Sequence, residues 1–159
     1  MPNGLKVKAN LAPANRRLEK LRAALTDLRP ALKNAATELT RRVWYRFAFK
    51  RDPDGRPWAP WAPSTAASNR KHPRRKLMLD TRQLRDTTKF IPGRQDLRAV
   101  IGTSYGKYHE QPDGKPGTGR LPRRAFLFSR SGSKRGLSQA DENYLLNALR
   151  YQLRKAAKD

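Results

Sequence analysis

The segment that most constrains the fold is residues 51–63, RDPDGRPWAPWAP, which joins a tight turn to a run of prolines. Pro53, Asp54 and Gly55 are typical turn residues: a proline for the first corner, a side chain that bonds nearby backbone, and a glycine that tolerates positive φ. The prolines that follow each remove a backbone donor and bias the preceding residue to extended angles, so these residues cannot form helix interior. We expect an extended ribbon that carries Trp58 and Trp61.

The two tryptophans of this ribbon allow three interpretations. They can pack on the core beneath a surface loop, or they can belong to a surface that docks another protein. They can also be platforms on which nucleic-acid bases stack. Core packing is the simplest of the three, and the residues themselves leave all three open.

Length and charge bound the class of protein. The chain has 159 residues and a formal net charge of +23, with 36 Lys plus Arg against 13 Asp plus Glu. We expect one domain over residues 15–159, preceded by a flexible basic arm over residues 1–14. Such a charge attracts polyanions whatever the fold. Cysteine is absent, which excludes disulfides and thiolate zinc sites, and no apolar run is long enough to predict a membrane span.

Apolar residues at helical spacing predict three helices. Leucines recur from Asn15, a candidate N-cap, to residue 28, and a second helix over residues 31–49 has Pro30 in its first turn. The end of this second helix, residues 43–49, is aromatic almost all round, so we expect burial on more than one face, against the sheet or a neighbouring subunit. The last helix starts near Ser138, with Asp141 placed as in a capping box.

The middle of the chain contains the strand signals. Residues 87–91 and 97–102 alternate and are rich in β-branched side chains, and a turn over residues 92–96 joins them into a hairpin. Long loops rich in glycine, proline or basic residues are expected at 51–76, 112–120 and 129–136. The predicted fold class is therefore α+β, with N-terminal helices and a C-terminal helix packed on a small antiparallel sheet.

The titratable residues give no catalytic constellation. His72 stands in a basic run without a carboxylate to orient it. His109 precedes Glu110, but the spacing matches no zinc motif, and a structural histidine bonded to backbone is the simpler interpretation. The sequence has no Walker loop, Rossmann glycine pattern or nucleophile elbow, so we expect no enzyme and no cofactor. A metal-dependent nuclease stays open as the lesser alternative.

Four blocks in order resemble the phage virion morphogenesis family, the tail-completion proteins of Mu-like and related tailed phages. They are PDGRPWAP at 53–60, LDTRQLRD at 79–86, IGTSYGKYHE at 101–110 and LPRRAFLF at 121–128. The chain departs from the family pattern at four positions: Arg82 replaces a glycine, Gly106 an alanine, Glu110 a glutamine and Ala125 a proline.

The resemblance implies a virion structural protein without an active site. It would form a ring, expected to be a hexamer, at the head-proximal end of the tail, with the tail tube and the neck or head-completion proteins as partners. The expected location is the virion, after assembly in the host cytoplasm. The competing interpretation is a free-standing basic nucleic-acid-binding protein.

A ring around the DNA path needs basic side chains that attract phosphate without reading sequence, and aromatic anchors between its subunits. The candidates for the DNA-facing role are Arg70, Lys71, Arg74, Arg75, Lys76, Arg123 and Arg124. The candidate interface residues or fold anchors are Pro53, Asp54, Gly55, Trp58, Trp61, Tyr105, His109 and Phe126.

Overall fold

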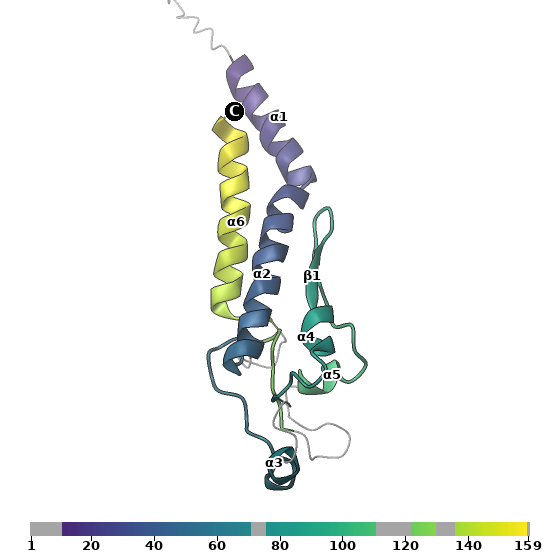
Figure 1. Cartoon of the computed structure of the whole chain (residues 1–159). Helices are drawn as coiled ribbons and strands as arrows, with labels where there is room; N and C mark the ends of the chain where they lie inside the picture. Colours follow the sequence, from purple (N-terminus) through teal and green to yellow (C-terminus); the bar gives the residue numbers. More distant parts are fainter. Residues whose placement is uncertain (1–10, 71–75, 111–121, 130–135, 159) are drawn as a thin grey trace, which may run out of the picture.

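A computed structural model describes residues 11–70, 76–110, 122–129 and 136–158 of the chain. Three long helices lie along one axis, a β-hairpin lies beside them, and three short helices lie toward one end (Figure 1). The predicted α+β architecture, with N-terminal and C-terminal helices around a small antiparallel sheet, is confirmed.

The two N-terminal helices are α1, Ala12–Thr26, and α2, Arg29–Phe49. The predicted break before Pro30 is confirmed: Pro30 lies in the first turn of α2, and the Asp27 carboxylate accepts a hydrogen bond from the Arg29 amide at 3.0 Å. The start of α1 differs from the prediction. Leu11, rather than Asn15, is at the N-cap, because Pro13 has the φ that a first helical turn requires.

The C-terminal helix α6, Gln139–Lys158, packs against both α1 and α2, and its end lies beside the start of α1 (Figure 1). The predicted hairpin consists of β1, Lys89–Pro92, and β2, Leu97–Val100, paired antiparallel with Phe90 opposite Ala99. β1 contacts α2, where the Thr40 hydroxyl accepts a hydrogen bond from the Phe90 amide at 3.0 Å. α2 is thus the central element of the fold.

The short helices are α3, Pro63–Arg70, α4, Gln83–Thr87, and α5, Gly106–His109. α3 corrects the prediction that residues 51–76 form one long loop. Its first residue is Pro63, which the sequence argument used only as a helix breaker. A proline stabilises a helix when it occupies the first turn, because the amide that it removes has no partner inside the helix.

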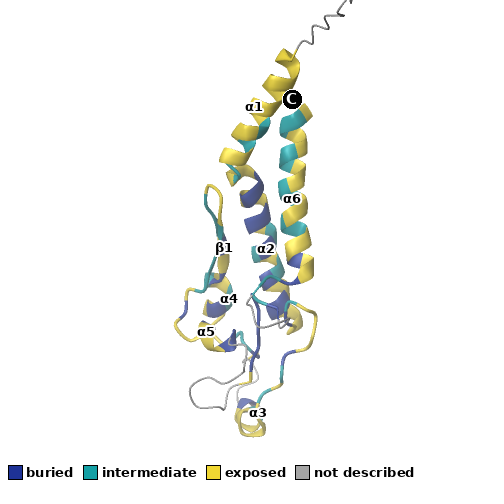
Figure 2. Cartoon of the chain, turned by 180° about the vertical axis from the view of Figure 1, so that it is seen from behind, coloured by how far each residue is buried: buried dark blue, intermediate teal, exposed yellow. Residues whose placement is uncertain are grey.

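The core lies along one face of α2 and beneath the ribbon. Leu39, Val43 and Phe47 of α2 are almost fully buried, with Trp58 and Phe126 packed against them. Figure 2 shows this concentration of buried residues on α2, whereas α1 is exposed along most of its length. None of the α1 side chains is buried, so the core holds one end of the molecule much more tightly than the other.

Candidate functional site

The turn at residues 51–58 is organised by the Asp52 carboxylate, which is buried. It accepts hydrogen bonds from the amides of Asp54, at 3.0 Å, and Arg56, at 2.8 Å. Gly55 has the positive φ of 81° expected from its place in the turn. The Asp54 carboxylate instead accepts a hydrogen bond from the Ser129 hydroxyl at 2.7 Å. The predicted turn with a side-chain-to-backbone bond is present, but the side chain that accepts this bond is that of Asp52. Asp54 connects the turn to the segment over residues 122–129.

Trp58 lies in the core. Its side chain is 6% exposed, its ring meets the Phe47 ring edge-on at 5.3 Å, and its indole N–H donates to the Ala125 carbonyl at 2.8 Å. Phe126 is fully buried beside Phe47. Trp58 and Phe126 are therefore fold anchors, meaning side chains that fix one segment on another inside the chain, and neither presents a ring to an external base.

Glu110 holds the segment over residues 122–129 in place. Its carboxylate is almost fully buried and accepts hydrogen bonds from the amides of Phe126, at 2.6 Å, Leu127, at 2.7 Å, and Phe128, at 3.2 Å. Burial raises the pKa of Glu110, while the three amides and the charge of Arg123 act in the opposite direction. Sequence reasoning did not give Glu110 this role. The only signal was its substitution for the glutamine that the resemblance leads one to expect.

The structure corrects the DNA-facing role of Arg123 and Arg124. Both residues are buried, and the Arg124 guanidinium donates to the carbonyls of Ala59 and Pro60, each at 2.8 Å. Arg123 donates to the Phe128 carbonyl at 3.2 Å. Burial lowers the pKa of Arg124. The physical reason is local: prolines in the ribbon leave carbonyls without amide partners nearby, and a guanidinium supplies several donors in one plane. These arginines shape the ribbon instead of facing a phosphate.

The other basic candidates are only partly described. Lys71, Arg74 and Arg75 lie outside the described residues, and so does the side chain of Arg70, the last residue of α3. Lys76 is exposed and lines a pocket.

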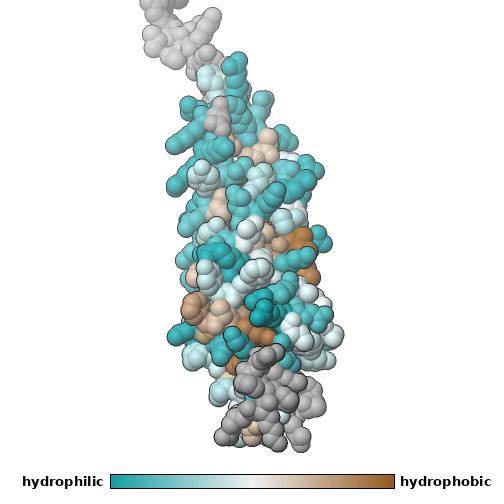
Figure 3. Space-filling view, in the orientation of Figure 1, coloured by the Kyte–Doolittle hydropathy of each residue, from teal (hydrophilic) through white to brown (hydrophobic). Residues whose placement is uncertain are grey.

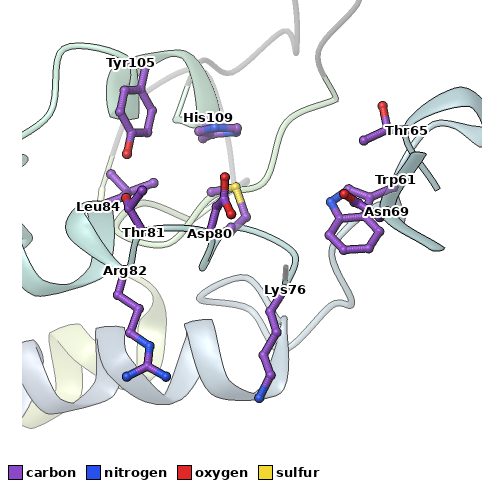
Figure 4. A pocket seen from close by; sticks show the side chains of 11 residues that line it. Trp61, Thr65, Asn69, Lys76, Asp80, Thr81, Arg82, Leu84, Tyr105 and His109 are labelled. Carbon is purple, nitrogen blue, oxygen red and sulfur yellow. The ribbon is translucent and has the colours of Figure 1, made fainter. Parts of the chain in front are cut away.

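That pocket, of about 390 Å³, lies between α3 and the α4–α5 region. Figure 4 shows Trp61 and Thr65 on one side and Tyr105 on the other, with His109 between them. Trp61 is partly buried against the core, and Tyr105 is largely exposed. Eleven residues line the pocket: Trp61, Thr65, Asn69, Lys76, Met78, Asp80, Thr81, Arg82, Leu84, Tyr105 and His109.

His109 is buried at this pocket, and desolvation, with the charge of Arg124, lowers its pKa to about 4. The ring is neutral near pH 7. The predicted ring-to-backbone bond is not observed at Nδ1, which has no partner among the described residues. Instead, the His109 carbonyl accepts a hydrogen bond from the Arg124 amide at 3.2 Å. His109 thus contributes to the fold through burial and its main chain.

A buried ion pair connects α2 with α6. The Asp141 carboxylate accepts hydrogen bonds from the guanidinium groups of Arg46 and Arg42, and Arg46 also donates to the Phe126 carbonyl at 2.9 Å. The Asp141 amide donates to the Ser138 hydroxyl at 3.3 Å, which confirms Ser138 as the cap of α6. Sequence reasoning assigned Asp141 only to that cap and missed its partners, 95 and 99 residues away.

The comparison with known families identifies the chain at this point. The sequence model of the phage virion morphogenesis family matches residues 9–154, which is most of the chain. The protein belongs to the phage virion morphogenesis family. No curated protein and no solved structure shows significant similarity to it.

This virion morphogenesis protein also exposes several large apolar side chains. Trp44 and Tyr45 are each 48% exposed and Phe49 is 67% exposed, all at the C-terminal end of α2. Among the described residues, the buried side chains at that helix end, Val43, Arg46 and Phe47, lie on one face, and the expected covering of a second face is not observed there. The face shown in Figure 3 is mostly hydrophilic, and its strongest apolar colour lies in the middle and lower part of the molecule.

The α1 helix adds a second exposed apolar strip to this morphogenesis protein. Leu11, Leu18 and Leu25 are spaced by seven residues, so they share one face of the helix, and each is more than half exposed. Among the described residues, no group of three or more His, Cys, Asp or Glu side chains could hold a metal ion. No helix in the described ranges is both long and apolar enough to cross a membrane.

Proposed function

We propose that this chain completes the phage tail at the head–tail joint, as a subunit of a ring that acts through protein–protein interfaces and not as an enzyme. Family membership supports a role in virion morphogenesis. The single observation that carries the finer proposal is the exposed aromatic face of α2, formed by Tyr45 and Phe49.

An exposed aromatic face supports assembly for an energetic reason. Large aromatic side chains dominate the binding energy of protein interfaces, and adjacent exposed ones are uncommon on a protein that works alone. In a ring with cyclic symmetry, one patch of each subunit packs against a different patch of the next. The Tyr45–Phe49 patch, whose two rings stack at 6.0 Å, is one candidate half of that contact, and the leucine strip of α1 is the other.

The proposal is tested with Tyr45→Ser combined with Phe49→Ser. Both side chains are exposed, so we expect the variant to fold like the wild type by circular dichroism, and to leave separate heads and tails when it replaces the wild-type gene in the phage. Tyr151→Ser is the control, because Tyr151 is 71% exposed on α6, away from that patch. Normal numbers of joined particles with the double variant would contradict the ring contact.

The charge of the chain supports a second part of the proposal, that the ring has a basic surface toward the DNA or the neck. A net charge of +23 produces salt-dependent attraction to phosphate without sequence readout, which suits DNA that has to slide. Lys76 and the adjoining basic residues 70–75 are the candidates. If replacing these cations with glutamine leaves both head–tail joining and DNA ejection unchanged, this part is wrong.

The alternative of a free-standing nucleic-acid-binding protein gives a different result in solution. Light scattering at moderate salt would then find a monomer, and titration with short duplexes would find tight, sequence-specific binding. A tail-completion ring predicts instead a discrete oligomer, or a monomer that assembles only on tails, and weak DNA binding that falls steeply with salt.

A further inference from the structure

A groove of about 620 Å³ runs between α2 and β1, on the well-packed part of the molecule. Its lining is predominantly apolar, from Ala36 and Trp44 of α2 and from Phe90 and Pro92 of β1. Trp44 is 48% exposed, so its ring is available to a partner at one end of the groove. The remaining lining residues are Lys33, Thr37, Thr40, Arg41 and Lys89.

The charged side chains that line the groove, among the described residues, are all basic: Lys33 and Arg41 from α2 and Lys89 from β1. The Arg85 guanidinium lies over the Trp44 ring, 5.4 Å from its centroid, but its charge is paired with Asp86 at 2.6 Å. Arg41 is partly compensated by Glu38 at 2.7 Å. Lys33 and Lys89 are exposed and form no ion pair within the described part of the chain, so both walls of the groove keep a positive charge.

This combination of an apolar floor and cationic walls disfavours a second copy of the chain as occupant. The chain carries 36 basic and 13 acidic residues. Its exposed amphipathic helix, α1, has no acidic residue in its first turn and carries arginines beside its leucines. Inserting that helix would set cations against cations, and like charges held together in an interface cost several kcal/mol, about the strength of a whole weak complex.

The backbone of the hairpin also limits the occupant. β1 pairs with β2 on one edge, and the Phe90 amide on the other side already donates to Thr40. Main-chain addition of a third strand at that position is therefore blocked. A recognition mode that needs no free strand edge is an amphipathic helix laid in the groove, with apolar side chains on the floor and its polar flanks toward the walls.

We propose that the groove binds an acidic amphipathic helix of a neighbouring virion protein, with Trp44 as the central anchor and Lys33 and Lys89 as the charge-selecting walls. This inference rests on the proposed role in tail assembly and adds the chemistry of one partner to it. It assigns to the groove a contact separate from the Tyr45–Phe49 patch, which faces the ring neighbour.

The test uses the purified full chain and two synthetic helical probes of about 18 residues, roughly five turns. The probes share their leucine and phenylalanine positions and differ only in having glutamate or lysine at every polar position. Binding is measured by fluorescence anisotropy at moderate salt. We expect the glutamate probe to bind and the lysine probe not to bind.

Two pairs of charge-reversal variants distinguish binding of the probe in the groove from general attraction to the basic chain. Lys33→Glu with Lys89→Glu is compared with Arg154→Glu with Lys155→Glu, which changes the net charge equally on exposed positions of α6. We expect the groove pair, and Trp44→Ser alone, to weaken binding by at least about tenfold, and the α6 pair by far less. Circular dichroism checks that each variant is folded.

Three outcomes would overturn the inference. The first is equal loss of binding in the two charge-reversal pairs, and the second is unchanged binding by Trp44→Ser. The third is a concentration-dependent dimer of the chain that Trp44→Ser dissociates, since the groove would then hold a second copy. The two proposals fail independently. The ring contact is tested by head–tail joining with Tyr45→Ser and Phe49→Ser, whereas the groove is tested by binding of the helical probes.

Discussion

Replacing Asp141 by asparagine isolates the contribution of the buried ion pair that joins α2 to α6. The substitution keeps the size of the side chain and its ability to accept hydrogen bonds, but removes the charge that faces Arg46 and Arg42. Glu142→Gln is the matched control, because it makes the same chemical change at the next residue, in the same first turn of α6, on an exposed side chain.

The expected magnitude follows from burial. Removing one partner of a buried ion pair costs about 3–5 kcal/mol, because the other charge stays buried and uncompensated. Arg46 is nearly buried but keeps its bond to the Phe126 carbonyl, and Arg42 is partly exposed, so we expect the lower end, about 3 kcal/mol. Glu142→Gln loses only the favourable interaction with the helix dipole, about 0.3–1 kcal/mol.

Urea unfolding followed by circular dichroism gives both free energies, and calorimetry should find a melting temperature lower by about 6–12 °C for Asp141→Asn. A cost for Asp141→Asn within about 1 kcal/mol of the control would refute the reasoning, since the pair would then behave like a solvent-exposed one.

The remaining predictions concern the segment over residues 122–129 and the buried histidine. Trp58→Phe should cost about 2 kcal/mol in urea unfolding, because the Ala125 carbonyl loses its donor and the smaller ring leaves a gap. Glu110→Ala should cost about 3 kcal/mol or more, since two buried amides and one part-buried amide lose their acceptor. Glu110→Gln keeps one acceptor oxygen for the Phe126 and Leu127 amides but not for the Phe128 amide, so it should cost less, about 1–2 kcal/mol. His109 has a pKa of about 4 in the folded chain against a usual 6.5, so as the pH falls the unfolded chain takes up the proton first. The contribution of neutral His109 to the free energy of unfolding is therefore complete above pH 6.5. It is lost as the pH falls toward 4, by about 3 kcal/mol in total. His109→Asn should flatten the fall in unfolding free energy over that pH range, and an unchanged slope would contradict the assignment.

The elements that could be predicted from the sequence are those with local signals. Leucine spacing and Pro30 mark α2, Ser138 marks the start of α6, and alternation around residues 92–96 marks the hairpin. Each signal is contained within about one or two turns of helix or one strand pair, so the neighbours that decide the conformation are neighbours in sequence. The starts of α1 and α3 were not predicted, because a proline can either end a helix or occupy its first turn, and the residues around it decide which.

The contacts of Glu110 and Arg124 could not be predicted as the helices and the hairpin could, because they join residues far apart in the chain. Glu110 meets amides 16 to 18 residues away, and Arg124 meets carbonyls 64 and 65 residues away. Charged residue types predict solvent exposure by default, and the same pattern of Arg123 and Arg124 is compatible with a phosphate-binding surface. Only the fold, which brings main-chain carbonyls to these side chains, decides between the two roles.

The same polar contacts are concentrated at one end of the molecule. Arg46, Glu110 and Trp58 tie α2, the ribbon and residues 122–129 together, and all three ties lie near the C-terminal end of α2. At the other end α1 buries none of its side chains and has α6 as its main contact. Its leucine strip stays more than half exposed in the described structure, so contact with another subunit or partner would add burial and stability to that helix. If the proposed ring forms, we therefore expect the aromatic face and the groove to keep their geometry on assembly, and α1 to gain burial in the particle.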